Sequence, residues 1–261
     1  MVTKLDTDIV FVCYPPFAGG KFLINCLGLS NDASLQNSKL LNLPTVEKFN
    51  ILMSSLQNIT DSWDDLNLGC KQLYGLSARD IQKQNISKTV EIINNKLNGY
   101  SGVCFLVIHT PEELSNAMHI WSKPRIVIFK NTDTFIKHRL GIKAKLKNYW
   151  DTVSQKDWPV NAPTTVDEYI KLPQHIYNDL EVKHSNKIYE MIMCYDDPLQ
   201  QFHAIIEDND VNYWDTEWYF SKINTIIHIN KLYKILKLPS VDNEYIEMYY
   251  DKWTHIMEKL K

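Results

Sequence analysis

Three continuous apolar runs constrain the fold of this chain most. They are DIVFVC at residues 8–13, GVCFLVIH at 102–109 and PRIVIFK at 124–130. Each run is rich in β-branched residues and shows no polar alternation, which is typical of strands covered on both faces. Segments with helical spacing of apolar residues lie between the first two runs. This order predicts an α/β fold with a parallel sheet flanked by helices.

The C-terminal half is predicted to be mostly helical. One helix is expected in SKINTIIHINKLYKILKLP, ending before Pro239. A second is expected in YIEMYYDKWTHIMEKL, with a stripe of apolar residues at helical spacing that is typical of core: Ile246, Tyr249, Tyr250, Trp253 and Ile256. The segment DWPVNAPTT is interpreted as a loop, and a single α/β domain over residues 1–261 is expected.

Composition excludes several classes of protein. A net charge of −3 provides no basic field for nucleic acid. The five cysteines lack CxxC spacing and are expected to be reduced core thiols. The N-terminus shows no signal-peptide pattern and no apolar run is long enough to span a membrane, so a cytoplasmic protein is expected. The histidines show no metal-ligand spacing, so no metal site is assigned.

The most informative short segment is YPPFAGGKFLIN, residues 14–25, directly after the first apolar run. A strand that runs through a glycine loop into a helix directs backbone N–H groups and the positive end of the helix dipole at one small volume. Gly19 and Gly20 allow close approach of an anion, and Lys21 adds a positive charge. These residues alone leave two interpretations about equally open: a phosphate site, or a tight turn with a solvated lysine.

The segment departs from the Walker A pattern G-x-x-x-x-G-K-[ST]. Pro15 stands at the first glycine position, and Phe22 stands where a hydroxyl would hold magnesium. An ordinary ATPase or GTPase is therefore not expected. The pattern that remains is a P-loop-like site for a phosphate group that needs no metal.

The segment VCYPPFAGGKFL resembles the 5′-phosphosulfate-binding loop of sulfotransferases, YPKSGTTWL, with one residue inserted. The stretch from FLVIHTP to IVIFKNTDTFIKHR is similar to that family's later strands, VKTHLP and KIIYVARNPKDVAVSYY, at a similar spacing. The resemblance covers a fifth to a quarter of the chain. It implies a P-loop-type α/β domain that uses 3′-phosphoadenosine 5′-phosphosulfate (PAPS) as donor, without metal, and a hydroxyl or amine on a small-molecule or glycan acceptor.

The resemblance also implies the roles of individual residues. His109 lies over the family's catalytic base, and Lys21 is expected to hold the phosphosulfate and stabilise charge on the leaving oxygen. Lys130 lies over an arginine that binds the 3′-phosphate, and His138 near a serine that contacts it. Without the resemblance, a packed or solvated histidine is favoured at position 109, and a solvated lysine is an equal alternative at 130. The expected cofactor-binding residues are Pro16, Phe17, Ala18, Gly19, Gly20, Lys21, Phe22, Lys130 and His138.

The chain departs from the family pattern at two lysine positions, which are Phe17 and Val107 here, and it lacks the C-terminal RKGxxGxWK signature. These departures keep open a non-catalytic nucleotide-binding module on the same fold. A P-loop kinase or other phosphotransferase is the second alternative, and the missing hydroxyl after Lys21 argues against it. The sequence predicts no oligomeric state and no specific acceptor.

Overall fold

The structure is a computed structural model that describes residues 5–6, 8–14, 18–33, 43–57, 81, 86–97, 102–132, 202–206 and 211–259. Its elements are, in chain order, β1 (Ile9–Cys13), α1 (Gly20–Gly28), α2 (Thr45–Gln57), α4 (Ile86–Leu97), β2 (Cys104–Ile108), α5 (Pro111–Ile120), β3 (Arg125–Lys130), β4 (Val211–Asp215), the 3-10 helix η3 (Thr216–Phe220), α12 (Lys222–Ile235) and α13 (Asn243–Lys259). The three apolar runs of the sequence therefore form β1, β2 and β3.

The described strands form one parallel sheet in the order β2-β1-β3-β4. β1 lies in the interior, where Val10 pairs with Phe105 on one side and with Arg125 on the other. The predicted α/β fold with a parallel sheet flanked by helices is confirmed. β4 is a strand that the apolar pattern does not predict, because its sequence VNYWD is polar at Asn212 and Asp215.

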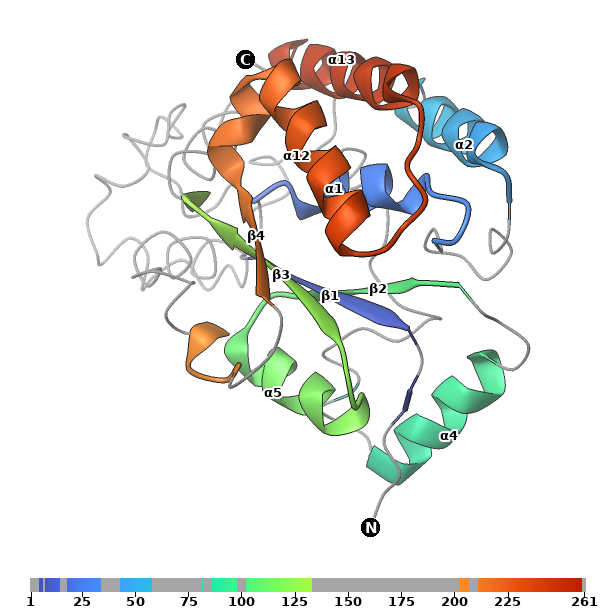
Figure 1. Cartoon of the computed structure of the whole chain (residues 1–261), viewed down its shortest axis with the longest axis vertical. Coiled ribbons are helices and arrows are strands. Elements are labelled where there is room, and N and C mark those ends of the chain that lie inside the picture. Colours follow the sequence, from blue (N-terminus) through green and yellow to red (C-terminus); the bar gives the residue numbers. More distant parts are fainter. Residues whose placement is uncertain are drawn as a thin grey trace, which may run out of the picture.

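Helices cover both faces of this sheet (Figure 1). α1, α2, α12 and α13 lie over one face, and α4 and α5 lie over the other. Side chains alternate along β1, so that Val10 and Val12 enter the core beneath α1 while Phe11 enters the core above α5. The burial of all five residues of β1 explains why this strand is a continuous apolar run.

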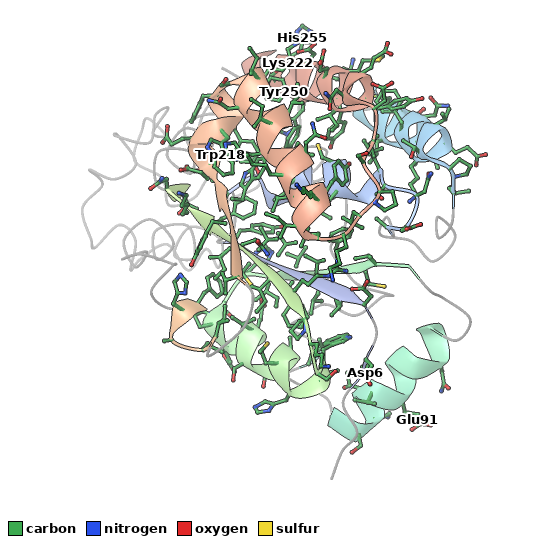
Figure 2. All side chains as sticks on the ribbon, in the orientation of Figure 1. Asp6, Glu91, Trp218, Lys222, Tyr250 and His255 are labelled. Carbon is green, nitrogen blue, oxygen red and sulfur yellow. The ribbon has the colours of Figure 1, made fainter. Side chains whose placement is uncertain are left out.

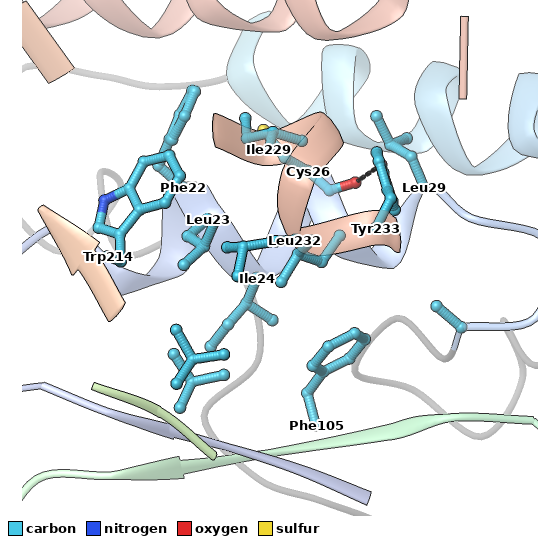
Figure 3. Packing of buried hydrophobic residues seen from close by; sticks show 14 of the residues in the cluster. Phe22, Leu23, Ile24, Cys26, Leu29, Phe105, Trp214, Ile229, Leu232 and Tyr233 are labelled. Atoms are coloured by element: carbon cyan, nitrogen blue, oxygen red, sulfur yellow. Dashed lines mark hydrogen bonds between the residues drawn. The ribbon is translucent and has the colours of Figure 1, made fainter. Parts of the chain in front are cut away.

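Helix α1 is packed between the sheet and the C-terminal helices (Figure 3). Leu23 and Ile24 lie above the sheet, and Phe22 lies near Trp214 of β4. All residues of α1 except Lys21 are buried. The helix is also held by buried hydrogen bonds: the Asn25 amide donates to the Tyr249 hydroxyl at 2.8 Å, and the Tyr233 hydroxyl donates to the Cys26 carbonyl. The position of α1 is thus determined by residues more than two hundred positions away.

Both predicted C-terminal helices are present. In α13, Ile246, Tyr249 and Tyr250 are buried, as the aromatic stripe predicts. In α12, the apolar residues do not all share one buried face, because Ile223 is 71% exposed and Ile227 is 45% exposed. The buried residues of α12 are Thr225, Ile229, Leu232 and Tyr233. Apolar residues surround much of α12, so their spacing does not identify the face that meets α1 and η3.

The cysteines that the structure describes are Cys13, Cys26 and Cys104, and all are free and buried. Burial raises the pKa of the Cys13 and Cys26 thiols, and the nearby Glu113 carboxylate adds to the effect at Cys13. A raised thiol pKa reduces the fraction of reactive thiolate. The expectation of reduced core thiols is confirmed for these residues. No helix in the described ranges combines the length and apolarity that a membrane span requires.

A buried lysine fastens α2 to the chain that follows α1. The Lys48 side chain is fully buried, and its ammonium donates to the carbonyls of Ser30 and Ala33. Ala33 is bridged to Val103, at the start of β2. Lys48 therefore joins α2 to the segment that crosses toward the sheet. Burial lowers the pKa of Lys48 from 10.5 to about 8, and the charge of Asp32 opposes this shift.

This shifted pKa predicts a pH dependence of stability. Between about pH 8 and pH 10.5 the unfolded chain keeps a proton on Lys48 that the folded chain releases, so stability should rise with pH. Relative to Lys48→Met, whose side chain does not titrate, the unfolding free energy of the native protein should increase by about 3 kcal/mol over this window. Denaturant titrations of both proteins at several pH values measure the difference. Parallel stability curves would show that Lys48 keeps its ordinary pKa.

Candidate functional site

The carboxyl ends of the strands define the edge of the sheet at which a ligand site is expected. β2 and β3 pair with opposite sides of β1. The order of the strands therefore reverses at β1. Open α/β sheets bind ligands at such a reversal, in the crevice beyond the carboxyl ends of the strands. The segments that leave this edge are the turn from β1 into α1, His109 after β2 and Asn131 after β3. They include most of the described residues that the sequence analysis assigns to the site.

The start of α1 is built on two glycines with different roles. Gly19 is the N-cap residue and has a φ of 78°, a left-handed conformation that glycine adopts without strain. Gly20 lies against the Tyr14 ring, and a Cβ atom at position 20 would come within 2.1 Å of a ring carbon. The Tyr219 hydroxyl donates to the Gly19 carbonyl at 2.9 Å from within the core. The start of α1 is thus fixed from both sides.

This helix start has the properties of an anion site. Gly19 has no side chain that could accept from the first N–H groups of the helix, and its carbonyl accepts from the Phe22 N–H at 2.9 Å. The first turn contains Lys21 and no acidic residue, and Lys21 is the one residue of α1 that is not buried. The partial positive charge of the helix end and the lysine charge therefore act in the same place.

His109 follows directly on β2 and is held against Tyr14. The imidazole Nδ1 lies 2.9 Å from the Tyr14 carbonyl oxygen. Because a carbonyl only accepts, Nδ1 carries the proton of the neutral ring and Nε2 carries the lone pair. The Tyr14 and His109 rings also meet edge to face, with centroids 4.8 Å apart. His109 is half-buried, and its orientation makes Nε2 the nitrogen able to accept a proton.

A cap at the start of α5 holds the backbone of His109. The Thr110 side chain accepts from the Glu113 N–H at 3.2 Å, and the Glu113 carboxylate accepts from the His109 N–H at 2.6 Å. This is a variant of the capping box in which the carboxylate reaches one residue further back. Its bond to the His109 N–H holds the Glu113 carboxylate close to the end of β2. Because Glu113 is buried, this bond is shielded from solvent. The sequence analysis does not identify Glu113, although T-P-E-E is a capping signal.

Lys130 ends β3 and is engaged with the neighbouring strand. Its ammonium lies 3.5 Å from the Asp215 carboxylate at the end of β4. Asp215 also accepts from the Asn131 amide at 2.8 Å and from the Glu217 N–H at 3.0 Å. Phe129 belongs to the core beneath α1. Because side chains alternate between the two faces along a strand, Lys130 is directed toward the opposite face of the sheet. Asp215 is a partner of Lys130 that no sequence pattern indicates.

An aromatic pair lies within electrostatic reach of this ion pair. Trp218 of η3 and His228 of α12 stack face to face, with ring centroids 3.3 Å apart and planes 1° apart. Figure 2 shows Trp218 beyond the end of β4, on the side that α12 covers. Partial burial lowers the pKa of His228, the Lys231 and Lys130 charges add to this, and the Asp215 charge opposes it. His228 is therefore mainly neutral at neutral pH.

The remaining predicted loop residues divide into two groups. Ala18 and Phe22 are buried, and the Phe22 ring packs among Tyr219, Tyr249 and Trp253. The Phe22 ring is therefore part of the core, and the cofactor-binding role expected for residue 22 stays a prediction. Pro16, Phe17 and His138 lie outside the described residues.

The structure brings Gly19, Gly20 and His109 together around Tyr14, a residue whose role the sequence analysis misses. It places Lys130 in a separate cluster with Asp215. Within the described ranges, no group of three or more histidine, cysteine, aspartate or glutamate side chains could hold a metal ion. Comparison of the chain with protein-family models, with curated proteins and with solved structures gives no match.

Proposed function

We propose that this protein is a sulfotransferase-like enzyme that binds PAPS at the start of α1 and uses His109 as general base. The observation that supports the proposal best is the contact of Tyr14 with both Gly20 and His109. Through this contact the start of α1 and an oriented imidazole lie beside each other. An anion-binding helix start beside a general base is suited to group transfer, and the resemblance of the loop to sulfotransferases favours sulfuryl transfer.

The residues fit the 5′ end of the donor. A glycine at position 20 leaves no side chain between Tyr14 and the helix start, and the N–H groups of the first turn are suited to phosphate oxygens. Lys21 would supply the full positive charge. The donor itself supplies an activated sulfuryl group on a phosphate leaving group. The buried Phe22 ring stands where a magnesium-ordering hydroxyl would be, which favours a donor that needs no metal there.

His109 would act on the acceptor. Its Nε2 takes the proton of the acceptor hydroxyl or amine as the acceptor forms a bond to sulfur, and the bond from sulfur to the bridging oxygen breaks with its electron pair on that oxygen. Lys21, in the first turn of α1, would stabilise the leaving oxygen. Val107 packs against the core on the same face as His109, so this position supplies no charge.

Lys130 remains the proposed contact of the 3′-phosphate, and its ion pair with Asp215 affects how strongly it would bind that group. Lys130 is 38% exposed while its partner Asp215 is 13% exposed, so the ammonium is the accessible end of the pair. A 3′-phosphate bound to Lys130 would share the ammonium with Asp215, which weakens the attraction. We therefore assign most of the donor affinity to the start of α1.

The proposal is tested by thermal denaturation in the presence of candidate nucleotides. Adenosine 3′,5′-bisphosphate at about a hundredfold excess over its Kd should stabilise the protein by about 2.7 kcal/mol without metal, which raises Tm by roughly 5 to 10 °C. ATP with magnesium and GTP should raise it less. A shift with ATP and magnesium alone would favour a kinase. A shift with the bisphosphate but no sulfuryl transfer to any acceptor tested would favour a non-catalytic nucleotide-binding module.

Replacing Lys21 by alanine should weaken binding of adenosine 3′,5′-bisphosphate by about 10- to 100-fold, the usual contribution of a charged hydrogen-bond donor. The fold should remain intact, because the Lys21 side chain is outside the core. Lys123→Ala is the matched control, since Lys123 is an exposed lysine just before β3. It lies at the amino end of this strand, whereas the proposed site lies at the carboxyl ends of the strands. Calorimetric titration measures both affinities. Equal affinities in the two variants would show that the anion binds elsewhere.

A further inference from the structure

We infer that Tyr14 is a positioning residue that couples the conformation of the first turn of α1 to the orientation and tautomer of His109. The inference rests on the proposed role of His109 as base and concerns how that base is held. It assigns to a residue at the end of β1 a function that the loop pattern does not contain.

The first contact of Tyr14 is with the helix start. Three atoms along one edge of its ring lie between 2.1 and 2.4 Å from the position that a Cβ atom at residue 20 would occupy. Only a glycine therefore permits the observed packing of ring on backbone. Because Gly20 is the first residue of α1, any change in this turn must displace the Tyr14 ring or be resisted by it.

The second contact of Tyr14 is with His109, and it uses two different groups. The Tyr14 carbonyl accepts from Nδ1 at 2.9 Å and selects the tautomer. The Tyr14 ring meets the imidazole at an interplanar angle of 87° and limits its rotation. The carbonyl alone does not set the plane of the imidazole, whereas the ring and the carbonyl together do.

The Tyr14 ring has little freedom to absorb a displacement. It is 3% exposed and packs on Phe129 of β3, with ring centroids 5.1 Å apart. Its own N–H donates to the Ile108 carbonyl at 3.0 Å, which fixes the Tyr14 backbone to the end of β2. A ring confined between Gly20, Phe129 and His109 transmits movement from one neighbour to another, because close-packed side chains have few alternative arrangements.

The backbone of His109 is held independently by Glu113. What Tyr14 determines is therefore the direction of the imidazole and not the position of residue 109. A base that points correctly only when the helix start is correctly formed would be assembled together with the anion site. This coupling predicts that a substitution at Gly20, on α1, changes the tautomer of His109, on the segment after β2.

The experiment reads the His109 tautomer by the ¹⁵N chemical shifts of its ring nitrogens, at a pH above its titration. The variants are Gly20→Ala, Tyr14→Leu, the double variant and Tyr14→Phe. In the native protein Nδ1 should show the protonated signature and Nε2 the unprotonated one. Tyr14→Phe, which keeps the ring, should retain this pattern. Tyr14→Leu keeps the carbonyl but removes the ring that limits rotation of the imidazole, so the imidazole should turn away from the carbonyl and the pattern should be lost. Gly20→Ala should lose it by displacing the ring.

The double variant separates coupling from general damage. Leucine lacks the outer ring atoms that a Cβ at position 20 would meet, so Gly20→Ala should change the tautomer no further in the Tyr14→Leu background. Far-UV circular dichroism identifies the variants that remain folded. If Gly20→Ala does not fold, the tautomer of His109 in Tyr14→Leu decides the result. A folded Tyr14→Leu or Gly20→Ala variant with the native tautomer overturns the inference. Failure of adenosine 3′,5′-bisphosphate to bind the native protein would overturn the proposed function and leave this result standing.

Discussion

Replacing His109 by alanine should lower turnover by about two to four orders of magnitude, the usual contribution of a positioned general base. Donor binding should be unchanged, because His109 contacts Tyr14 and Glu113 and is not part of the start of α1. The measurement compares the rate of sulfuryl transfer with the Kd of adenosine 3′,5′-bisphosphate. A loss of rate at constant Kd identifies a group that acts in the transition state.

His119→Ala is the matched control for this prediction. His119 is an exposed histidine on α5, ten residues from His109 along the same segment. Its removal should leave both the rate and the Kd unchanged. If His109→Ala retains native turnover, His109 is a packed histidine at a strand end, and the non-catalytic interpretation of the fold becomes the better one. If the Kd rises with the loss of rate, His109 contributes to the donor site as well.

Replacing Phe22 by alanine should lower the unfolding free energy by about 3 to 5 kcal/mol. The Phe22 ring is buried and has four aromatic neighbours among the residues that the structure describes, with centroid distances of 4.6 Å to Trp253, 5.4 Å to Tyr249, 5.5 Å to Tyr219 and 6.0 Å to Tyr250. Alanine would leave a cavity where η3, α1 and α13 meet. The affinity of the folded protein for the nucleotide should be unchanged, since the Phe22 ring is packed in the core.

Phe22→Leu is the matched control, because leucine retains most of the apolar volume and should cost less than alanine. Denaturant titration gives the stabilities, and calorimetry at low temperature gives the affinities of the folded variants. A Phe22→Ala variant that remains fully stable but loses nucleotide affinity would return Phe22 to the ligand site. That result would contradict the packing seen around α1.

Local chemistry accounts for what was predictable at the site. Gly19, Gly20 and Lys21 are adjacent in the chain, and a strand that ends in glycines and enters a helix directs N–H groups to one point wherever it lies in the fold. The conformation of Gly19 and the absence of a Cβ at Gly20 agree with that expectation. His109 follows an apolar run, and every parallel strand brings its carboxyl end to the same edge of the sheet.

Contacts between distant segments were not predictable. Tyr14 and His109 are 95 positions apart, Lys130 and Asp215 are partners across two strands, and Tyr219 reaches the Gly19 carbonyl from 200 positions away. β4 is not predicted from the sequence, because a strand at the edge of the described sheet tolerates polar residues that an interior strand excludes. Pairing of this kind leaves no periodic signal in a single sequence.

The sequence by itself determined the parallel α/β class, the core role of the buried cysteines and α13, and the glycine loop that enters α1. These features depend on the burial of continuous apolar runs and on the conformational freedom of glycine, which are properties of short segments. Only the tertiary structure decided that Phe22 belongs to the core, that Lys130 is paired with Asp215, and that Tyr14 joins His109 to Gly20. Each of these depends on which side chains meet after the strands have assembled, because packing selects one neighbour among many that the sequence permits.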